Sequence, residues 1–139
     1  MLKNKTSLFF LVAGSVLVFD QLTKDLFFTS KLKLNSGVAL GLMPGIDIMI
    51  IGFLIILIAF IFRSQIKRMP LAFGLFFGGA VSNLLDRFIY GGVRDFLPIP
   101  LTNLSNNLAD WAIVISIGLI LVQSLSFKNK DLDPKNKKD

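Results

Sequence analysis

Four apolar stretches, separated by short polar segments, run through most of this chain. They cover roughly residues 8–28, 46–62, 70–90 and 108–127. An α-helix rises about 1.5 Å per residue, so about 20 apolar residues cross the hydrocarbon of a bilayer. The pattern therefore predicts an all-α membrane protein built as a bundle of four transmembrane helices.

The segments between and after these stretches predict less regular structure. Residues 34–42 mix Gly, Val, Ala and Leu, which favours a small β-like element outside the membrane. Residues 96–106 contain Pro98 and Pro100 among several Asn and Ser, which predicts an irregular loop. Residues 128–139 are polar, with five Lys, and predict a disordered tail. We expect one domain over residues 1–127, followed by this tail.

Composition strengthens the membrane interpretation. Hydrophobic residues make up 53% of the chain and charged residues 17%, with a mean hydropathy of +0.69. Soluble domains carry about 25% charged residues. The excess apolar surface is best explained if it faces lipid.

The basic residues predict an orientation, and the net charge is +6. With four spans, ten of the fifteen Lys and Arg lie on the same side of the membrane. Such residues favour the cytoplasmic side, so both termini should be cytoplasmic and residues 29–45 and 91–106 outside. Because these cations flank apolar stretches, they indicate membrane orientation, and we expect no nucleic-acid partner. The ten are Lys3, Lys5, Arg63, Lys67, Arg68, Lys128, Lys130, Lys135, Lys137 and Lys138.

The chain has no Cys, His or Glu, so its acidic side chains are nine Asp. Thiolate chemistry and the usual zinc ligands are excluded, and we expect neither a metal site nor a cofactor. Acid–base chemistry at neutral pH therefore falls mainly to Asp.

Four of these aspartates should meet at the outer end of the bundle. Asp20 lies about 18 Å along the first predicted helix and Asp86 about 24 Å along the third. Asp95 lies between the third and fourth helices, and Asp110 in the first turn of the fourth. Charged groups inside a membrane are costly and usually functional. Their convergence therefore predicts a functional site.

Spacing predicts several local contacts among the helical polar residues. Asp20 and Lys24 are four residues apart and can form an ion pair. The pair could be merely interfacial, with Lys24 extending to the membrane interface. Asp86 could form a structural ion pair with Arg87 or Arg94.

Two further features concern helix packing and a helix start. Asn83 could hydrogen-bond between helices, and the run at residues 78–80 favours close helix packing. Asn107, three residues before Asp110, could cap the fourth helix.

Asp95 and Asp110 could face each other across the outer end of the bundle. Two neighbouring carboxyl groups would share one proton, as in aspartic proteases, so that one activates water and the other polarises an amide carbonyl. Spacing alone leaves other interpretations open. The aspartates could be structural, or they could form the proton path of a small proton-coupled transporter.

Five motifs occur in order along the chain and resemble the lipoprotein signal peptidase family, also called signal peptidase II. The resemblance covers nearly all of the chain except the tail. The motifs are DQLTK at 20–24, NSGVA at 35–39, GGAVSNLLDR at 78–87, GVRDF at 92–96 and NLAD at 107–110.

The resemblance implies a membrane aspartyl endopeptidase of the bacterial inner membrane. Family members remove the signal peptide of a prolipoprotein, cutting just before a cysteine that carries diacylglycerol, and are inhibited by the cyclic peptide globomycin. Asp95 and Asp110 match the catalytic aspartates. Asp20 and Lys24 match a motif that supports structure. The residues that match supporting or substrate-binding positions are Asn35, Asn83, Asp86, Arg87 and Asn107.

Two positions depart from the usual pattern of the family. Ser82 stands where Gly is frequent, and Asn106 where Phe is frequent. Neither touches the proposed aspartate pair, so they bear on substrate preference more than on the reaction.

Overall fold

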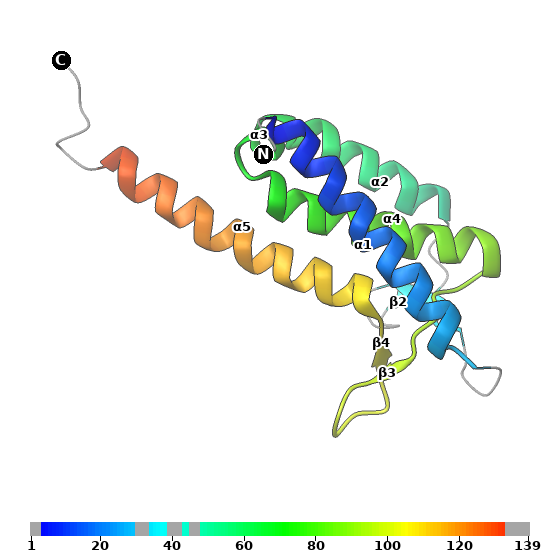
Figure 1. Ribbon diagram of the computed structural model, residues 1–139. Helices are drawn as coiled ribbons and strands as arrows, with labels where there is room; N and C mark the ends of the chain where they lie inside the picture. Colours follow the sequence, from blue (N-terminus) through cyan, green and yellow to red (C-terminus); the bar gives the residue numbers. More distant parts are fainter. Residues whose placement is uncertain (1–3, 30–33, 39–42, 45–47, 133–139) are drawn as a thin grey trace, which may run out of the picture.

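A computed structural model describes residues 4–29, 34–38, 43–44 and 48–132 of the chain, and its architecture is mostly helical (Figure 1). This confirms the predicted predominance of helix. The helices are α1 (Lys5–Phe27), α2 (Ile48–Ile61), α3 (Arg63–Arg68), α4 (Pro70–Tyr90) and α5 (Leu108–Leu132).

Local sequence explains where several helices begin and end. The side chain of Asn4 accepts a hydrogen bond from the backbone N–H of Thr6 and caps α1. Pro70 occupies the first turn of α4, where its missing N–H costs nothing. Gly91 ends α4 at a φ of 75°, a left-handed conformation that glycine adopts without strain.

The helices differ in their fitness to cross a membrane. In the described chain, two are both long and apolar enough: α1, and residues 108–127 of α5. Helix α2 is apolar but has 14 residues, or about 21 Å. Helix α4 has 21 residues but contains many polar ones at its C-terminal end. Four spans therefore remain a prediction. Helix α5 also continues five residues beyond the predicted end at 127.

Two short antiparallel strand pairs lie in the connections. β1 (Gly37–Val38) pairs with β2 (Met43–Pro44), which confirms a small β element near residues 34–42, although residues 39–42 lie outside the described residues. β3 (Leu97–Pro98) pairs with β4 (Ser105–Asn106). The prediction of a wholly irregular loop at 96–106 is therefore wrong. A two-stranded pair consists only of edge strands, where Pro98 is tolerated.

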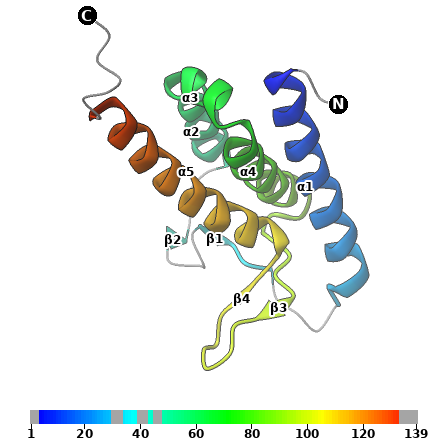
Figure 2. The same ribbon diagram turned by 60° about the vertical axis from the view of Figure 1, so that its left-hand side comes forward.

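Helix α4 packs between α1 and α5, and small residues permit the close approach (Figures 1 and 2). A Cβ atom added to Gly78 would lie 2.6 Å from the carbonyl oxygen of Ala13 in α1. One added to Gly79 would lie 2.5 Å from the carbonyl oxygen of Ala109 in α5. The prediction that this run packs closely against other helices is confirmed, and it brings the polar residues of three helices together.

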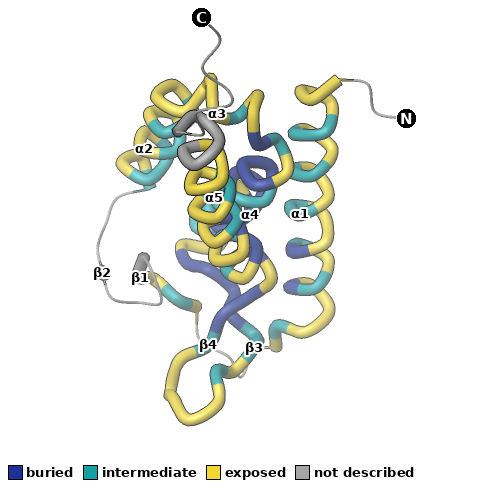
Figure 3. The backbone as a smooth tube through the Cα atoms, turned by 90° about the vertical axis from the view of Figure 1, so that its left-hand side faces the viewer, coloured by how far each residue is buried: buried dark blue, intermediate teal, exposed yellow. Residues whose placement is uncertain are grey.

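Buried residues lie in α4 and in the segment that connects it to α5 (Figure 3), and their chemistry differs between the two ends of the molecule. Near the start of α1 and α3, buried Met69, Ala72, Phe73 and Phe77 form an apolar core. The buried residues toward the strand pairs are mostly polar. The outward faces of α1, α2 and α5 expose large apolar side chains, as expected of surfaces that contact lipid: Phe10, Phe19, Phe53, Phe60, Ile56 and Val122.

Candidate active site

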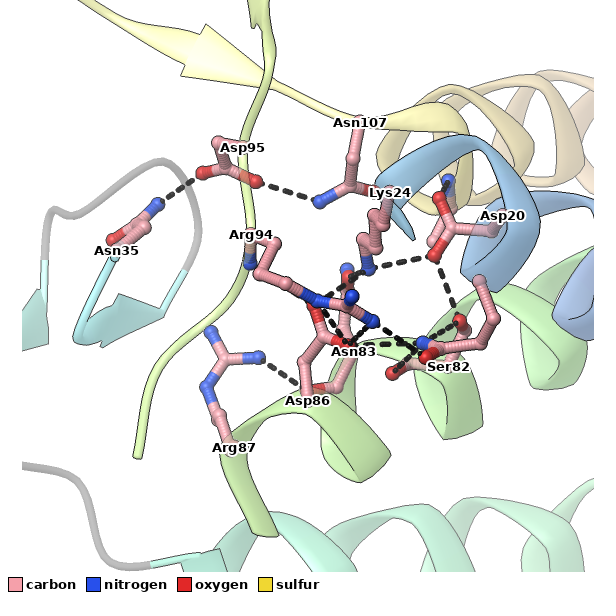
Figure 4. A network of polar contacts seen from close by, with 12 residues as sticks. Asp20, Lys24, Asn35, Ser82, Asn83, Asp86, Arg87, Arg94, Asp95 and Asn107 are labelled. Carbon is pink, nitrogen blue, oxygen red and sulfur yellow. Dashed lines mark hydrogen bonds and ion pairs between the residues drawn. The ribbon is translucent and has the colours of Figure 1, made fainter. Parts of the chain in front are cut away.

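A cluster of fully buried charged residues lies where α1 and α4 approach each other at the strand-bearing end (Figure 4). Lys24 Nζ is 2.6 Å from Asp20 Oδ2 and 3.1 Å from Asp86 Oδ2, and all three side chains are 0% exposed. The predicted Asp20–Lys24 pair is confirmed. The alternative that Lys24 extends to the membrane interface is wrong, because its ammonium group lies between two carboxylates.

Asp20 connects three helices through its two oxygens. Ser82 in α4 donates its hydroxyl to Asp20 Oδ2 at 2.7 Å. The backbone N–H of Ala109 in α5 donates to Asp20 Oδ1 at 2.8 Å. Ser82 therefore uses its hydroxyl, which a glycine at this position would lack, to satisfy a buried carboxylate.

Asp86 is the second centre of the cluster. It accepts hydrogen bonds from the backbone N–H of Arg94 at 3.0 Å and from Arg94 Nη2 at 2.9 Å. Gln21 Nε2 also donates to Asp86 Oδ1 at 2.9 Å. Of the two predicted alternatives for an ion pair with Asp86, the one with Arg94 is confirmed. Arg87 Nη1 donates to the backbone oxygen of Asn83 at 3.1 Å.

Asn83 connects this cluster to Asp110. Lys24 Nζ donates to Asn83 Oδ1 at 3.0 Å, and Asn83 Nδ2 donates to Asp110 Oδ1 at 2.8 Å. The predicted hydrogen bonding of Asn83 between helices is confirmed. Because Lys24 can only donate, it orients the amide so that the Asn83 nitrogen faces Asp110.

Asn107 lies between the two aspartates. Its Oδ1 accepts from the backbone N–H of Asp110 at 3.0 Å, which confirms the predicted cap of α5. Its own backbone N–H lies 3.3 Å from Asp110 Oδ2. Its Nδ2 donates to Asp95 Oδ1 at 2.6 Å. One side chain and its backbone therefore contact both carboxylates.

Asn35 holds Asp95 from the opposite side. Its Nδ2 donates to Asp95 Oδ2 at 2.7 Å, while its backbone exchanges two hydrogen bonds of 2.8 Å with Val93. Burial raises the pKa of Asp95 above the ordinary value of a carboxyl group, and the hydrogen bonds from Asn35 and Asn107 only partly oppose it. The raised pKa extends the pH range over which this carboxyl group holds its proton.

Asp95 and Asp110 both line one cavity of about 690 Å³. Its polar wall also contains Asn35, Asn83 and Arg87, and its apolar wall includes Ile51, Ile55, Ile113 and Val114. Two carboxyl groups on one cavity can share a proton and act together as general base and general acid. The apolar wall suits a ligand with hydrocarbon chains.

The structure gathers all nine of the predicted site residues at one end of the molecule, in two layers. Asn35, Asn83, Arg87, Asp95 and Asp110 line the cavity. Asp20, Lys24, Asp86 and Asn107 lie behind it and hold its members. Sequence reasoning gave no site role to Gln21 or Ser82, and treated Arg94 only as an ion-pair candidate. The signal for all three was their place inside the motifs at 20–24, 78–87 and 92–96.

Comparison with known proteins agrees with the family resemblance of the five sequence motifs. The family model for signal peptidase (SPase) II matches residues 12–126. A lipoprotein signal peptidase of Desulfitobacterium hafniense (strain DSM 10664 / DCB-2) is 38% identical over 111 residues, covering 76% of this chain and 74% of that protein. A lipoprotein signal peptidase of Campylobacter jejuni (strain RM1221) is 36% identical over 154 residues, covering 96% and 98%.

Two solved structures resemble the fold, both described as bacterial membrane enzymes determined by the in meso method. The one at 2.3 Å resolution has a TM-score of 0.71 and 26% identity, covering 93% of this chain and 92% of that one. The one at 1.9 Å resolution has a TM-score of 0.66 and 26% identity, covering 83% and 90%. The similarity therefore extends over most of the fold.

Proposed function

The chain belongs to the signal peptidase II family, and from that premise we propose that it removes signal peptides from bacterial prolipoproteins. It does so as a membrane aspartic endopeptidase, cutting on the N-terminal side of a cysteine that carries diacylglycerol. The observation that carries the proposal is that Asp95 and Asp110 line one cavity and are both hydrogen-bonded to Asn107.

The two carboxyl groups divide the chemistry between them. The ionised member removes a proton from a water molecule, whose oxygen attacks the carbonyl carbon of the scissile peptide. The protonated member donates a hydrogen bond to the carbonyl oxygen, which gains negative charge as the tetrahedral intermediate forms. The C–N bond then breaks, and a carboxyl proton passes to the departing amine. After this step the two carboxyl groups again share a single proton, as they did before the reaction.

The neighbouring residues place and support this pair. Asn35 and Asn107 hold Asp95, and Asn83 and Asn107 hold Asp110. Arg87 lines the cavity and is suited to bind polar groups of the substrate. Asp20, Lys24 and Asp86 form the buried support behind the cavity. The reaction requires no metal ion or cofactor.

The proposed setting is the bacterial inner membrane, with four spans, both termini cytoplasmic and the active site at the outer leaflet. Lys5 and the basic residues of α3 lie at the end opposite the aspartates (Figures 2 and 3), which supports this orientation. Residues 1–127 would form the enzymatic domain and 128–139 a cytoplasmic tail.

The proposed partners follow from the cavity. Acyl chains and the apolar signal helix would lie along Ile51, Ile55, Ile113 and Val114. Membrane lipids would contact the exposed apolar faces of α1, α2 and α5. Globomycin would compete for the same cavity. A proton-coupled transporter is not favoured, because a proton path would spread carboxylates through the bundle, whereas these collect at one end.

Purified protein in detergent tests the function with two forms of one prolipoprotein, with and without diacylglycerol on the cysteine. We expect cleavage before the modified cysteine, little cleavage of the unmodified form, and inhibition by globomycin. Mass spectrometry identifies the cut. Failure to cleave the modified form, in protein whose fold is verified by its melting transition, would contradict the proposal.

A further inference from the structure

Arg94 directly precedes Asp95, and its side chain lies outside the cavity. The residues on either side, Val93 and Asp95, line the cavity. Successive side chains of an extended segment point to opposite sides. Arg94 therefore points back toward the buried ion cluster, and the residue is only 5% exposed (Figure 4).

The guanidinium group of Arg94 contacts three side chains from two helices. Nη2 donates to Asp86 Oδ1 at 2.9 Å in α4 and to Gln21 Oε1 at 2.7 Å in α1. Nη1 forms an ion pair with Asp25, in the last turn of α1. The group also lies 4.4 Å from the centroid of the Tyr90 ring.

Asp86 also binds the backbone of Arg94. Its N–H donates to Asp86 Oδ2 at 3.0 Å, so Asp86 binds the residue through both main chain and side chain. On the other side of the segment, Val93 pairs with Asn35. The connection from α4 to α5 is thus fastened at the two residues immediately before Asp95.

We propose that Arg94 is a positioning residue for Asp95: it ties the α4–α5 connection to α1 and α4, and thereby fixes where the Asp95 carboxyl group meets Asp110. This inference rests on the proposed function, in which Asp95 takes part in catalysis. Arg94 itself does not touch the substrate.

The geometry explains why arginine suits this task. Its planar fork donates to Asp86, Gln21 and Asp25 at once, whereas a lysine ammonium is a single point of charge. A displacement of about 1 Å at a reacting group can lower a rate by roughly 10²-fold. Loss of the fork should therefore reduce the rate of chemistry more than substrate binding.

The test compares Arg94→Met, Arg94→Lys and Asp25→Asn with the parental enzyme on diacylglyceryl-modified prolipoprotein. Arg63→Met is the matched control, because Arg63 is exposed on α3 at the opposite end. For each variant kcat and KM are measured separately, and kcat is expressed per folded molecule from the melting transition.

We expect Arg94→Met to lower kcat at least tenfold with KM within about twofold of the parent. Arg94→Lys should recover part of the loss, and Asp25→Asn should lower kcat severalfold. Arg63→Met should match the parent.

The inference is overturned if folded Arg94→Met keeps the parental kcat and only melts at a lower temperature, or if KM rises while kcat is unchanged. If Arg94→Met does not fold, parental kcat in both Arg94→Lys and Asp25→Asn overturns it. An inactive parental enzyme would instead contradict the proposed function.

Discussion

Asn83 Nδ2 in α4 donates a hydrogen bond to Asp110 Oδ1 in α5 over 2.8 Å. The other end of the same amide accepts from Lys24 in α1. The Asn83 side chain thus links the buried Lys24 ammonium group to Asp110, one of the two aspartates at the cavity, and helps to fix the position of its carboxyl group. The amide cannot turn over without placing its oxygen against a carboxylate and its nitrogen against an ammonium group.

Replacing this amide should impair activity. Asn83→Ala removes one hydrogen bond to Asp110 and leaves the Lys24 ammonium group without one of its acceptors. Leaving a buried donor unsatisfied in this way costs about 1–3 kcal/mol of free energy. We expect kcat to fall roughly 10- to 100-fold. The measurement is steady-state cleavage of modified prolipoprotein. A parental kcat in folded Asn83→Ala would show that Asp110 keeps its place without this amide.

Lys24 should be important chiefly for stability. Lys24→Met leaves the buried carboxylates of Asp20 and Asp86 without the cation between them. Removing one member of a buried ion pair lowers the free energy of unfolding by about 3–5 kcal/mol. Lys67→Met, at an exposed position of α3, is the control. Equal unfolding midpoints for the two variants in detergent would contradict the structural role of Lys24.

Gly79 should be required for the placement of α5. In Gly79→Ala, the new Cβ would lie 2.5 Å from the carbonyl oxygen of Ala109, which directly precedes Asp110. Because this neighbour is backbone, α5 has to move, at a cost of about 1–3 kcal/mol. We expect kcat to fall about tenfold or more.

Gly118→Ala is the matched control for this change, since no atom outside the helix backbone lies within 4 Å of a Cβ at Gly118. It should retain parental activity. Equal activity of the two variants would show that the contact between α4 and α5 can relax without disturbing Asp110.

The raised pKa of Asp95 predicts a pH dependence of stability. Burial disfavours the charged form, so the folded protein binds the Asp95 proton more tightly than the unfolded chain does. This group therefore lowers stability as pH rises from its unfolded pKa through its higher folded pKa. At pH values below both the folded and the unfolded pKa, the ionisation of Asp95 has no effect on stability.

Asp95→Asn removes this titration, so its stability relative to the parent should increase as pH rises through that range. The hydrogen bonds that Asn35 and Asn107 donate to the carboxyl group are lost with it, and their effect on its pKa is part of the same difference in slope. Unfolding midpoints from pH 3 to 8 test this. A parallel pH profile for the variant and the parent would contradict the raised pKa.

Much of the fold could be predicted because it depends on local pattern. Apolar stretches of about helical length predicted the positions of α1, α4 and α5 closely. The end of α5 was predicted five residues early, because residues 128–131 are polar but still continue the helix to Leu132. The β3–β4 pair escaped prediction, since its strands have two residues each and show no alternation.

The site was predicted where contacts are close in sequence, as for Asp20 with Lys24 and Asn107 with Asp110. The contacts of Asn35 with Asp95 and of Lys24 with Asn83 span about 60 residues, and only helix packing creates them. Arg94 illustrates the same limit. Its position beside Asp95 was visible in the sequence, but its partners at the end of α1 were not.

The central claim is that Asp95 and Asp110 together hydrolyse the peptide bond. Its most direct test is single-turnover cleavage of diacylglyceryl-modified prolipoprotein by folded Asp95→Asn and Asp110→Asn variants. Each change removes one carboxyl group while nearly preserving its shape. We predict that either variant cleaves roughly 10³-fold more slowly than the parent, or not at all. Cleavage by either folded variant at the parental rate would contradict the account.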